Sequence, residues 1–202
     1  VIGIDLAKNV IQVCIISQDG ELLSNKAVSP NKLKELLANK KSSIVAMEGC
    51  SACNFWGRLA QSHGHVVRII GPRKVKAFLQ GQKTDANDAL AIAVAASQPG
   101  MVFSQLKSED QQRMQSIESS RKFISKELFS LTNHMRAALY EYGITTRRGQ
   151  KGFKQLVVDV LDDHILGFPQ ALKSVLRILW ERFCQTLEQL DGIEKQRAQL
   201  IK

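Results

Sequence analysis

Apolar and polar residues repeat with two different spacings in the first hundred residues of this chain. Short apolar or alternating runs, typical of strands, cover residues 1–5, 10–16, 21–28, 43–48 and 65–70. Apolar residues spaced by three and four, typical of helices, cover residues 30–38, 55–62, a short stretch after Pro72, and 85–97. Ser29 suits a helix N-cap and Gly64 suits a helix end. The pattern predicts three strands, two helix–strand units and a final helix.

This order of elements is typical of a ribonuclease-H-like α/β fold, in which a mixed sheet carries helices on both faces. The first and fourth strands lie side by side in such a sheet, so Asp5 and Glu48, each at a strand end, are expected to be neighbours. Asp85 and Asp88 are three residues apart at the start of the last helix. They are therefore expected to share one helix face.

From residue 108 the pattern changes to two long helical stretches, separated by a glycine-rich basic segment at residues 143–152 and a short apolar piece at 153–166. Ser108-Glu109-Asp110-Gln111 fits a capping box. A coiled-coil-like stripe interrupted at Arg121 follows, with apolar residues Met114, Ile117, Ile124, Leu128, Leu131, Met135, Ala138 and Tyr142. A second stripe comprises Leu172, Leu176, Leu179, Phe183, Leu187, Leu190 and Ile193. We expect a catalytic domain at residues 1–100 and an all-α coiled-coil-like extension at 101–202; periodicity equally allows a helical hairpin packed on its own core.

Asp5, Glu48, Asp85 and Asp88 are the candidate catalytic and metal-binding residues. Each alone has an ordinary explanation as a turn, cap or helix-dipole residue, although burying Glu48 without a partner would be costly. Four carboxylates that converge repel one another unless cations hold them. Hard divalent cations prefer such oxygen ligands, and one or two Mg²⁺ ions serve phosphodiester chemistry in this arrangement. The four acids together therefore predict a magnesium-dependent enzyme acting on nucleic acid.

The chain has a formal net charge of +9, which favours a polyanionic partner. Residues 68–84 contain no acid and lead directly into the Asp85 helix. A second basic run is rich in glycine and lies within residues 143–154. Such runs are commonly solvated surface, but beside a carboxylate site they are candidate phosphate contacts. The candidates in these two runs are Arg73, Lys74, Lys76, Lys83, Arg147, Arg148, Lys151 and Lys154.

Other chemistries have weaker support. The four cysteines do not make a disulfide framework, and the Cys50-x-x-Cys53 pair lacks the second ligand pair that a zinc site needs. No apolar run has the roughly 20 residues of a membrane span, and no signal peptide is visible. A cytoplasmic location without membrane association is therefore expected. Because the chain begins without Met in a strand and stops in a helical pattern, we expect a partial protein.

Four short motifs resemble the Asp-Glu-Asp-Asp (DEDD) transposases of the insertion-sequence one-ten family, above all its eleven-eleven branch. They are Gly3-Ile4-Asp5-Leu6-Ala7-Lys8, Met47-Glu48-Gly49, Val75-Lys76-Ala77-Phe78 and Lys83-Thr84-Asp85-Ala86-Asn87-Asp88-Ala89. The resemblance covers nearly the whole chain, and the last motif is its most specific part. The sequence departs from the common pattern at residues 50–54, where a Thr-Gly pair and an aromatic residue are usual.

The resemblance implies a RuvC-like N-terminal domain, a coiled coil and a C-terminal transposase domain, the last of these absent from this chain. It also relates the chain to the pilin-gene invertase. Family members are thought to recombine DNA under the guidance of a non-coding bridge RNA, as dimers and tetramers, in the prokaryotic nucleoid. The four acids carry over as Asp5, Glu48, Asp85 and Asp88, and Lys8 joins the expected nucleic-acid contacts. A serine of the C-terminal domain would be the DNA nucleophile.

Three other functions remain open from the residues themselves. A Holliday-junction-type endonuclease would use the same four acids with water as the nucleophile. A non-catalytic RNA-binding module would hold the acids for structural reasons. A sugar-kinase-like ATPase also begins with a Gly-Ile-Asp strand, but this chain lacks a second phosphate loop. Asp5→Asn separates enzyme from binding module, because only an enzyme has strand cleavage to lose.

Overall fold

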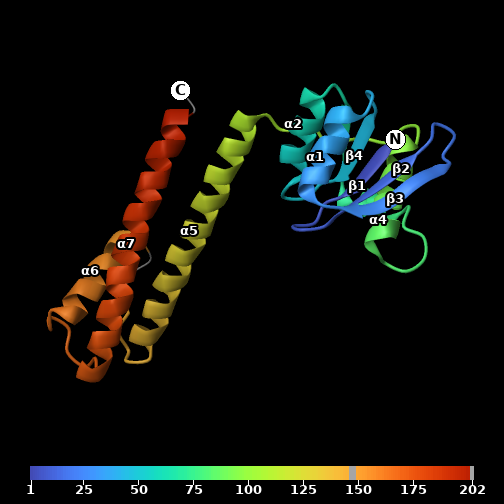
Figure 1. Ribbon diagram of the computed structural model, residues 1–202. Coiled ribbons are helices and arrows are strands. Elements are labelled where there is room, and N and C mark those ends of the chain that lie inside the picture. Colours follow the sequence, from blue (N-terminus) through green and yellow to red (C-terminus); the bar gives the residue numbers. More distant parts are fainter. Residues whose placement is uncertain (146–148, 201–202) are drawn as a thin grey trace. The chain divides into compact units, whose positions relative to one another are not determined.

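The computed structural model describes residues 1–145 and 149–200. The chain forms two compact units, Val1–Gln112 and Arg113–Lys202. The first contains a sheet with helices, and the described residues of the second form helices and no strand (Figure 1). No helix among the described residues is long and apolar enough to cross a membrane.

The first unit is built on a mixed five-stranded sheet with the order β3-β2-β1-β4-β5. The strands are β1 (Ile2–Asp5), β2 (Ile11–Ile16), β3 (Leu22–Val28), β4 (Ile44–Glu48) and β5 (Val66–Ile70). β2 runs antiparallel to both β1 and β3, whereas β4 runs parallel to both β1 and β5. The expected adjacency of the first and fourth strands is confirmed, with Gly3 opposite Ala46.

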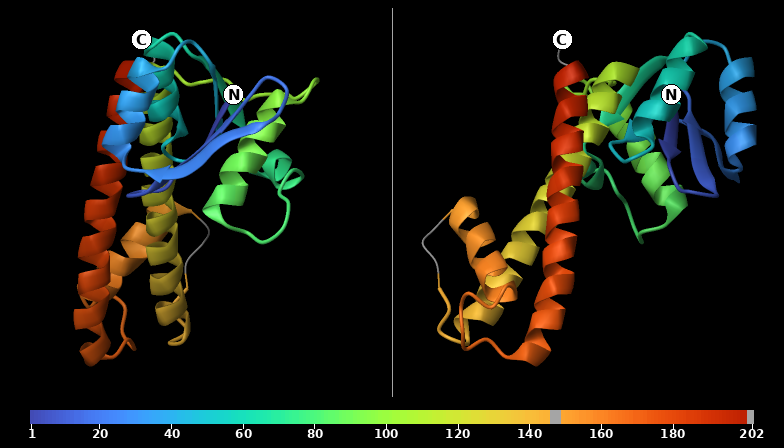
Figure 2. Two further views of the ribbon diagram at one scale, coloured as in Figure 1. Left: turned by 45° about the vertical axis from the view of Figure 1, so that its right-hand side comes forward. Right: turned by 90° about the vertical axis from the view of Figure 1, so that its left-hand side faces the viewer.

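Helices cover both faces of this sheet, as expected. The helices are α1 (Pro30–Asn39), α2 (Cys53–Ser62), α3 (Pro72–Lys76) and α4 (Asp85–Ser97). Alternate residues of β1 point to opposite faces. Ile2 and Ile4 are buried in a core shared with α1 and α2, whereas α4 packs on the other face (Figure 2). The central strands β1, β2 and β4 therefore lie between two helical layers, whereas β3 has no buried residue.

Local signals place the helix ends close to where the sequence predicts them. The Ser29 side chain accepts a hydrogen bond from the Lys32 backbone N–H at the start of α1. Gly64 adopts a left-handed φ of 81° just after α2, a conformation that glycine tolerates best. α2 begins two residues earlier than expected, because Cys53 joins Trp56 in the core.

The second unit contains three packed helices. α5 (Glu109–Tyr140) begins in the first unit with the predicted capping box, since Ser108 and Gln111 exchange two side-chain-to-backbone hydrogen bonds. α6 (Gln150–Leu161) and α7 (Gln170–Leu200) complete the unit. α6 begins inside the glycine-rich basic segment, for which the sequence predicted no helix. Its Phe153 and Val157 are fully buried, so apolar burial outweighs the local glycines.

The apolar stripes of α5 and α7 face a core within this same chain. Leu128, Met135 and Leu139 of α5 meet Leu176 and Phe183 of α7 in one buried cluster. Arg121, where the α5 stripe is interrupted, forms ion pairs with Glu118 and with Glu194 of α7. The structure thus contains a helical hairpin packed on its own core, which the apolar periodicity of the sequence allowed as an alternative. A coiled coil with another chain stays a prediction.

Candidate metal and nucleic-acid site

Small residues let α4 approach the sheet closely. Gly3 lies beneath α4, and a Cβ built on it would lie 2.4 Å from the Ala89 carbonyl oxygen and 2.6 Å from the Ala93 nitrogen. Both are backbone atoms of the helix, so no side-chain rotation would relieve the overlap. Because Asp5 is two residues further along β1, its side chain faces the same layer as Gly3. Close packing at Gly3 therefore brings α4 next to Asp5.

The first turn of α4 carries the other two aspartates. The Thr84 hydroxyl caps the helix by accepting a hydrogen bond from the Asn87 backbone N–H. The Asn87 side-chain amide donates to the Gln82 carbonyl at 2.8 Å, which ties the helix start to the preceding loop. Asp85 and Asp88 follow on one face, as their spacing predicts. Negative charge is favourable in this first turn because of the helix dipole.

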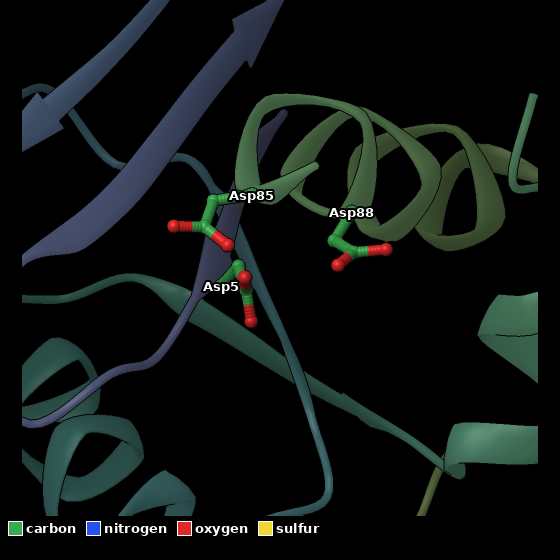
Figure 3. Close-up of side chains that lie close together, drawn as sticks. All are labelled: Asp5, Asp85 and Asp88. Carbon is green, nitrogen blue, oxygen red and sulfur yellow. The ribbon is translucent and has the colours of Figure 1, made fainter. Parts of the chain in front are cut away.

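Three of the four predicted carboxylates lie close together. Carboxylate oxygens of Asp5, Asp85 and Asp88 all lie within 4.8 Å of one another. Figure 3 shows the Asp5 side chain extending from β1 towards the two aspartates on α4. Glu48 lies outside this three-residue group but lines the same cavity, which has a volume of about 530 Å³. Two helix residues and two strand-end residues thus share one cavity.

The electrostatics of the cavity are those of crowded carboxylates. Burial, followed by the charges of Asp88, Asp85 and Glu48, raises the pKa of Asp5 above its ordinary value. Burial and then the charge of Asp88 raise the pKa of Glu48. Lys83 opposes both shifts. The folded chain therefore holds excess negative charge in this cavity, which a cation would relieve.

The donor atoms suit a hard divalent cation. All four side chains offer carboxylate oxygens, which Mg²⁺, Mn²⁺ and Ca²⁺ prefer. The cavity has no histidine in its lining, and its single thiol belongs to Cys50. Soft-metal chemistry at the Cys50-x-x-Cys53 pair has no further support, because among the described residues neither cysteine belongs to a group of three potential metal ligands. The residues present fit a divalent cation held by oxygen ligands.

The structure separates the predicted basic residues into groups. Lys76 and Lys83 line the carboxylate cavity. Arg73 and Lys74 are exposed on α3, and Lys8 is exposed in the loop after β1. The second unit carries Lys151 and Lys154 on α6. Arg147 and Arg148 lie outside the described residues.

Sequence reasoning missed part of the cavity wall. Leu6, Cys50, Pro72, Val75 and Leu79 also line it. Cys50 comes two residues after Glu48, just beyond the end of β4. This position was the one feature of the sequence that could have indicated that Cys50 lines the cavity. Leu6 and Val75 belong to two of the motifs that carry the family resemblance, but an apolar side chain gives no chemical signal of a site. Their role emerges only from the way α3 and the following loop fold over the strand ends.

The raised pKa values predict how stability depends on pH. Because the pKa of Asp5 is higher in the folded chain than in the unfolded one, its stabilising contribution is present below the unfolded pKa. That contribution is lost as pH rises through the folded pKa. Asn carries no charge at any pH. In EDTA, the unfolding free energy of Asp5→Asn minus that of the wild type should therefore increase as the pH rises from 4 to 8. Urea unfolding at several pH values tests this, and a pH-independent difference would contradict it.

The fold and this cavity define a class of protein: a mixed sheet with helices on both faces that gathers carboxylates at the ends of its adjacent central strands. Residues 2–144 match the family model of the IS110-type DEDD transposases, described simply as a transposase. The chain belongs to this family.

Several curated relatives carry the same description. The chain is 32% identical, over 202 residues, to the transposase for insertion sequence element IS1111A of Coxiella burnetii, covering 100% of this chain and 56% of that protein. It is 36% identical over 195 residues to the transposase for insertion sequence element IS1328 of Yersinia enterocolitica, covering 96% and 58%. A probable family 20 transposase of Pseudomonas aeruginosa is 35% identical over 188 residues, covering 93% and 55%. The chain spans about half the length of the curated relatives it matches.

Among solved structures, T. thermophilus RuvC in complex with a Holliday junction substrate aligns with 46% of this chain and 89% of that chain. The TM-score is 0.36 and the sequence identity is 18%.

Proposed function

We propose that this chain supplies the metal-binding part of a transposase active site that cuts and rejoins DNA. The observation that carries the proposal is the convergence of Asp5, Asp85 and Asp88, with Glu48 in the same cavity. Membership of the transposase family supports the same chemistry. The four acids are the proposed metal ligands and Mg²⁺ the proposed ion, with one or two ions bound.

Each side chain has a distinct proposed task. Asp5 and the two α4 aspartates hold the cation between a rigid strand and a capped helix, and Glu48 supplies a further ligand from β4. Divalent ions bound there stabilise charge on the attacking and leaving oxygens of a phosphodiester. A serine from a C-terminal domain outside residues 1–202 is the proposed nucleophile. The residues of this chain therefore bind and orient the reacting phosphate.

Nucleic-acid contacts are proposed around this cavity. Lys76 and Lys83 are the best placed, because they line the cavity that holds the acids. Phosphate contacts of this kind position a substrate without reading its sequence. Further contacts are proposed for Lys8, Arg73, Lys74, Arg147, Arg148, Lys151 and Lys154. The proposed partners are target DNA, a bridge RNA encoded beside the gene, and further copies of the protein in a dimer or tetramer. The prokaryotic nucleoid is the proposed location.

Electrophoretic binding tests the nucleic-acid part of this proposal. The chain should bind the non-coding RNA flanking its own gene more tightly than an unrelated RNA of equal length, and Asp5→Asn should retain that preference. The Lys76→Ala/Lys83→Ala pair should weaken binding and reduce the salt slope by about 0.7–0.9 per lysine that contacts phosphate. Lys32→Ala/Lys34→Ala on α1 is the matched control, because α1 covers the opposite face of the sheet.

If the chain binds both RNAs equally and salt weakens that binding, guidance by a specific RNA would be contradicted. Nonspecific electrostatic attraction would then explain the binding. Strand cleavage gives the second readout, measured with the full-length protein. Asp5→Asn should abolish cleavage while RNA binding persists. Cleavage of four-way junctions by the 202-residue chain alone, without any serine from another domain, would instead identify a junction endonuclease.

A further inference from the structure

A chain of two hydrogen bonds crosses the sheet from the Asp5 position to the start of α4. The Gln12 side-chain Nε2 donates to Asn25 Oδ1 at 2.7 Å. The Asn25 Nδ2 in turn donates to the backbone carbonyl of Ala86 at 2.8 Å. Gln12 lies on β2 directly opposite Asp5, and Ala86 lies between Asp85 and Asp88. The two bonds thus join the strand side and the helix side of the carboxylate cluster.

The chemistry of Asn25 suits this position better than that of any other side chain of similar size. The Ala86 oxygen accepts hydrogen bonds and donates none, so the amide nitrogen of Asn25 must face it. The amide oxygen then faces Gln12 and accepts from it. An aspartate at residue 25 would present oxygen to oxygen at Ala86, and a leucine would leave both partners without this bond. Only a side-chain amide both accepts and donates in this geometry.

The position of this contact matters because the cluster repels itself. Three carboxylates within 4.8 Å push the first turn of α4 away from β1 when no cation is bound. The Thr84 cap and the Asn87–Gln82 bond hold the helix start to its own loop. Asn25 instead bonds the first turn to β3, 61 residues earlier in the sequence. Together with the packing of Ala89 against Gly3, this hydrogen bond opposes outward movement or rotation of the turn relative to the sheet.

We infer that Asn25, itself oriented by Gln12, is a positioning residue that holds Asp85 and Asp88 within reach of the cation shared with Asp5. The inference rests on the proposed metal site and extends it to two residues outside the cavity. Asn25 is not among the residues that line the cavity. Its effect is to preorganise the ligands, so that binding does not have to pull the helix turn into place.

Manganese binding to the 202-residue chain tests this role, followed by calorimetric titration and by the Mn²⁺ paramagnetic resonance signal. Asn25→Leu should weaken Mn²⁺ binding by about tenfold, as loss of a ligand-orienting partner commonly does. Gln12→Leu should produce a smaller loss, because Asn25 keeps its bond to Ala86. Gln98→Ala is the matched control: it removes an amide-to-carbonyl bond to Val94 at the other end of the same helix. That variant should bind Mn²⁺ like the wild type.

Thermal unfolding in EDTA separates positioning from folding. Asn25→Leu should unfold at nearly the wild-type temperature, because the lost bond is offset by relief of carboxylate repulsion. If a folded Asn25→Leu chain binds Mn²⁺ with wild-type affinity, the inferred role of Asn25 is wrong, but the proposed metal site is not contradicted. Mn²⁺ binding that is absent or insensitive to Asp5→Asn would overturn the metal site and this inference together. If Asn25→Leu does not fold, Gln12→Leu decides: unchanged Mn²⁺ affinity in that variant overturns the inference.

Discussion

Asp5→Asn is expected to make the metal-free chain more stable at neutral pH while abolishing its stabilisation by Mg²⁺ or Mn²⁺. Burial, followed by the charges of Asp88, Asp85 and Glu48, raises the pKa of Asp5, so its negative charge is unfavourable in the folded state. Asn keeps the shape and removes the charge. A ligand present at 100 times its dissociation constant stabilises a folded protein by about 2.7 kcal/mol, and the variant should lose that amount. Thermal unfolding in EDTA and in Mn²⁺ measures both effects.

Asp19→Asn is the matched control for this experiment. Asp19 lies in the exposed turn between β2 and β3, and the substitution makes the same change in net charge. It should leave both the metal-free stability and the response to Mn²⁺ unchanged. If Asp5→Asn still gained the full stabilisation from Mn²⁺, the cation would bind elsewhere and the proposed ligand set would be wrong.

Gly3→Ala is expected to destabilise the first unit by about 1–3 kcal/mol, the usual range for overpacking a tight core. The added methyl group would overlap backbone atoms of α4 at 2.4 and 2.6 Å, so the helix must move away from β1. That movement also carries Asp85 and Asp88 away from Asp5, and Mn²⁺ affinity should fall in the same variant. Urea unfolding measures the first effect, and Mn²⁺ titration of the folded variant measures the second.

Gly49→Ala adds the same methyl group at the end of β4. Its nearest neighbours would be the Ile70 carbonyl oxygen at 3.6 Å and an Ile69 methyl at 3.7 Å, which are ordinary contacts. This variant should be nearly as stable as the wild type. Equal stability of Gly3→Ala and Gly49→Ala would show that α4 adjusts freely, and the close approach at Gly3 would then have no role in forming the site.

Local elements of the first unit were predictable because their signals are local. The capping hydroxyl of Ser29, the apolar run of β1 and the i, i+3 spacing of Asp85 and Asp88 each act within a few residues. The order of these elements also predicted that β1 and β4 are neighbours, since few sheet topologies accommodate it. The four acids could therefore be named from the sequence and brought to one end of the sheet.

The local pattern did not reveal α6. The sequence showed only a glycine-rich basic segment followed by a short apolar piece, whereas the helix begins at Gln150 and buries Phe153 and Val157. The stripes of α5 and α7 were equally consistent with an intermolecular coiled coil. Their periodicity is the same for a partner in the same chain or in another, and only the packed core around Met135 and Phe183 shows an intramolecular partner.

The sequence by itself determined the strands and helices of the first unit, the sides that their apolar residues face, and four carboxylates as candidate site residues, because these depend on spacing along the chain. The tertiary structure alone decided that Asp5 lies closer to the α4 aspartates than Glu48 does, and that Lys76 and Lys83 share their cavity. It also decided that Asn25 reaches Ala86. These outcomes depend on strand register and on how closely a helix approaches a glycine, and both are set by packing between segments far apart in sequence.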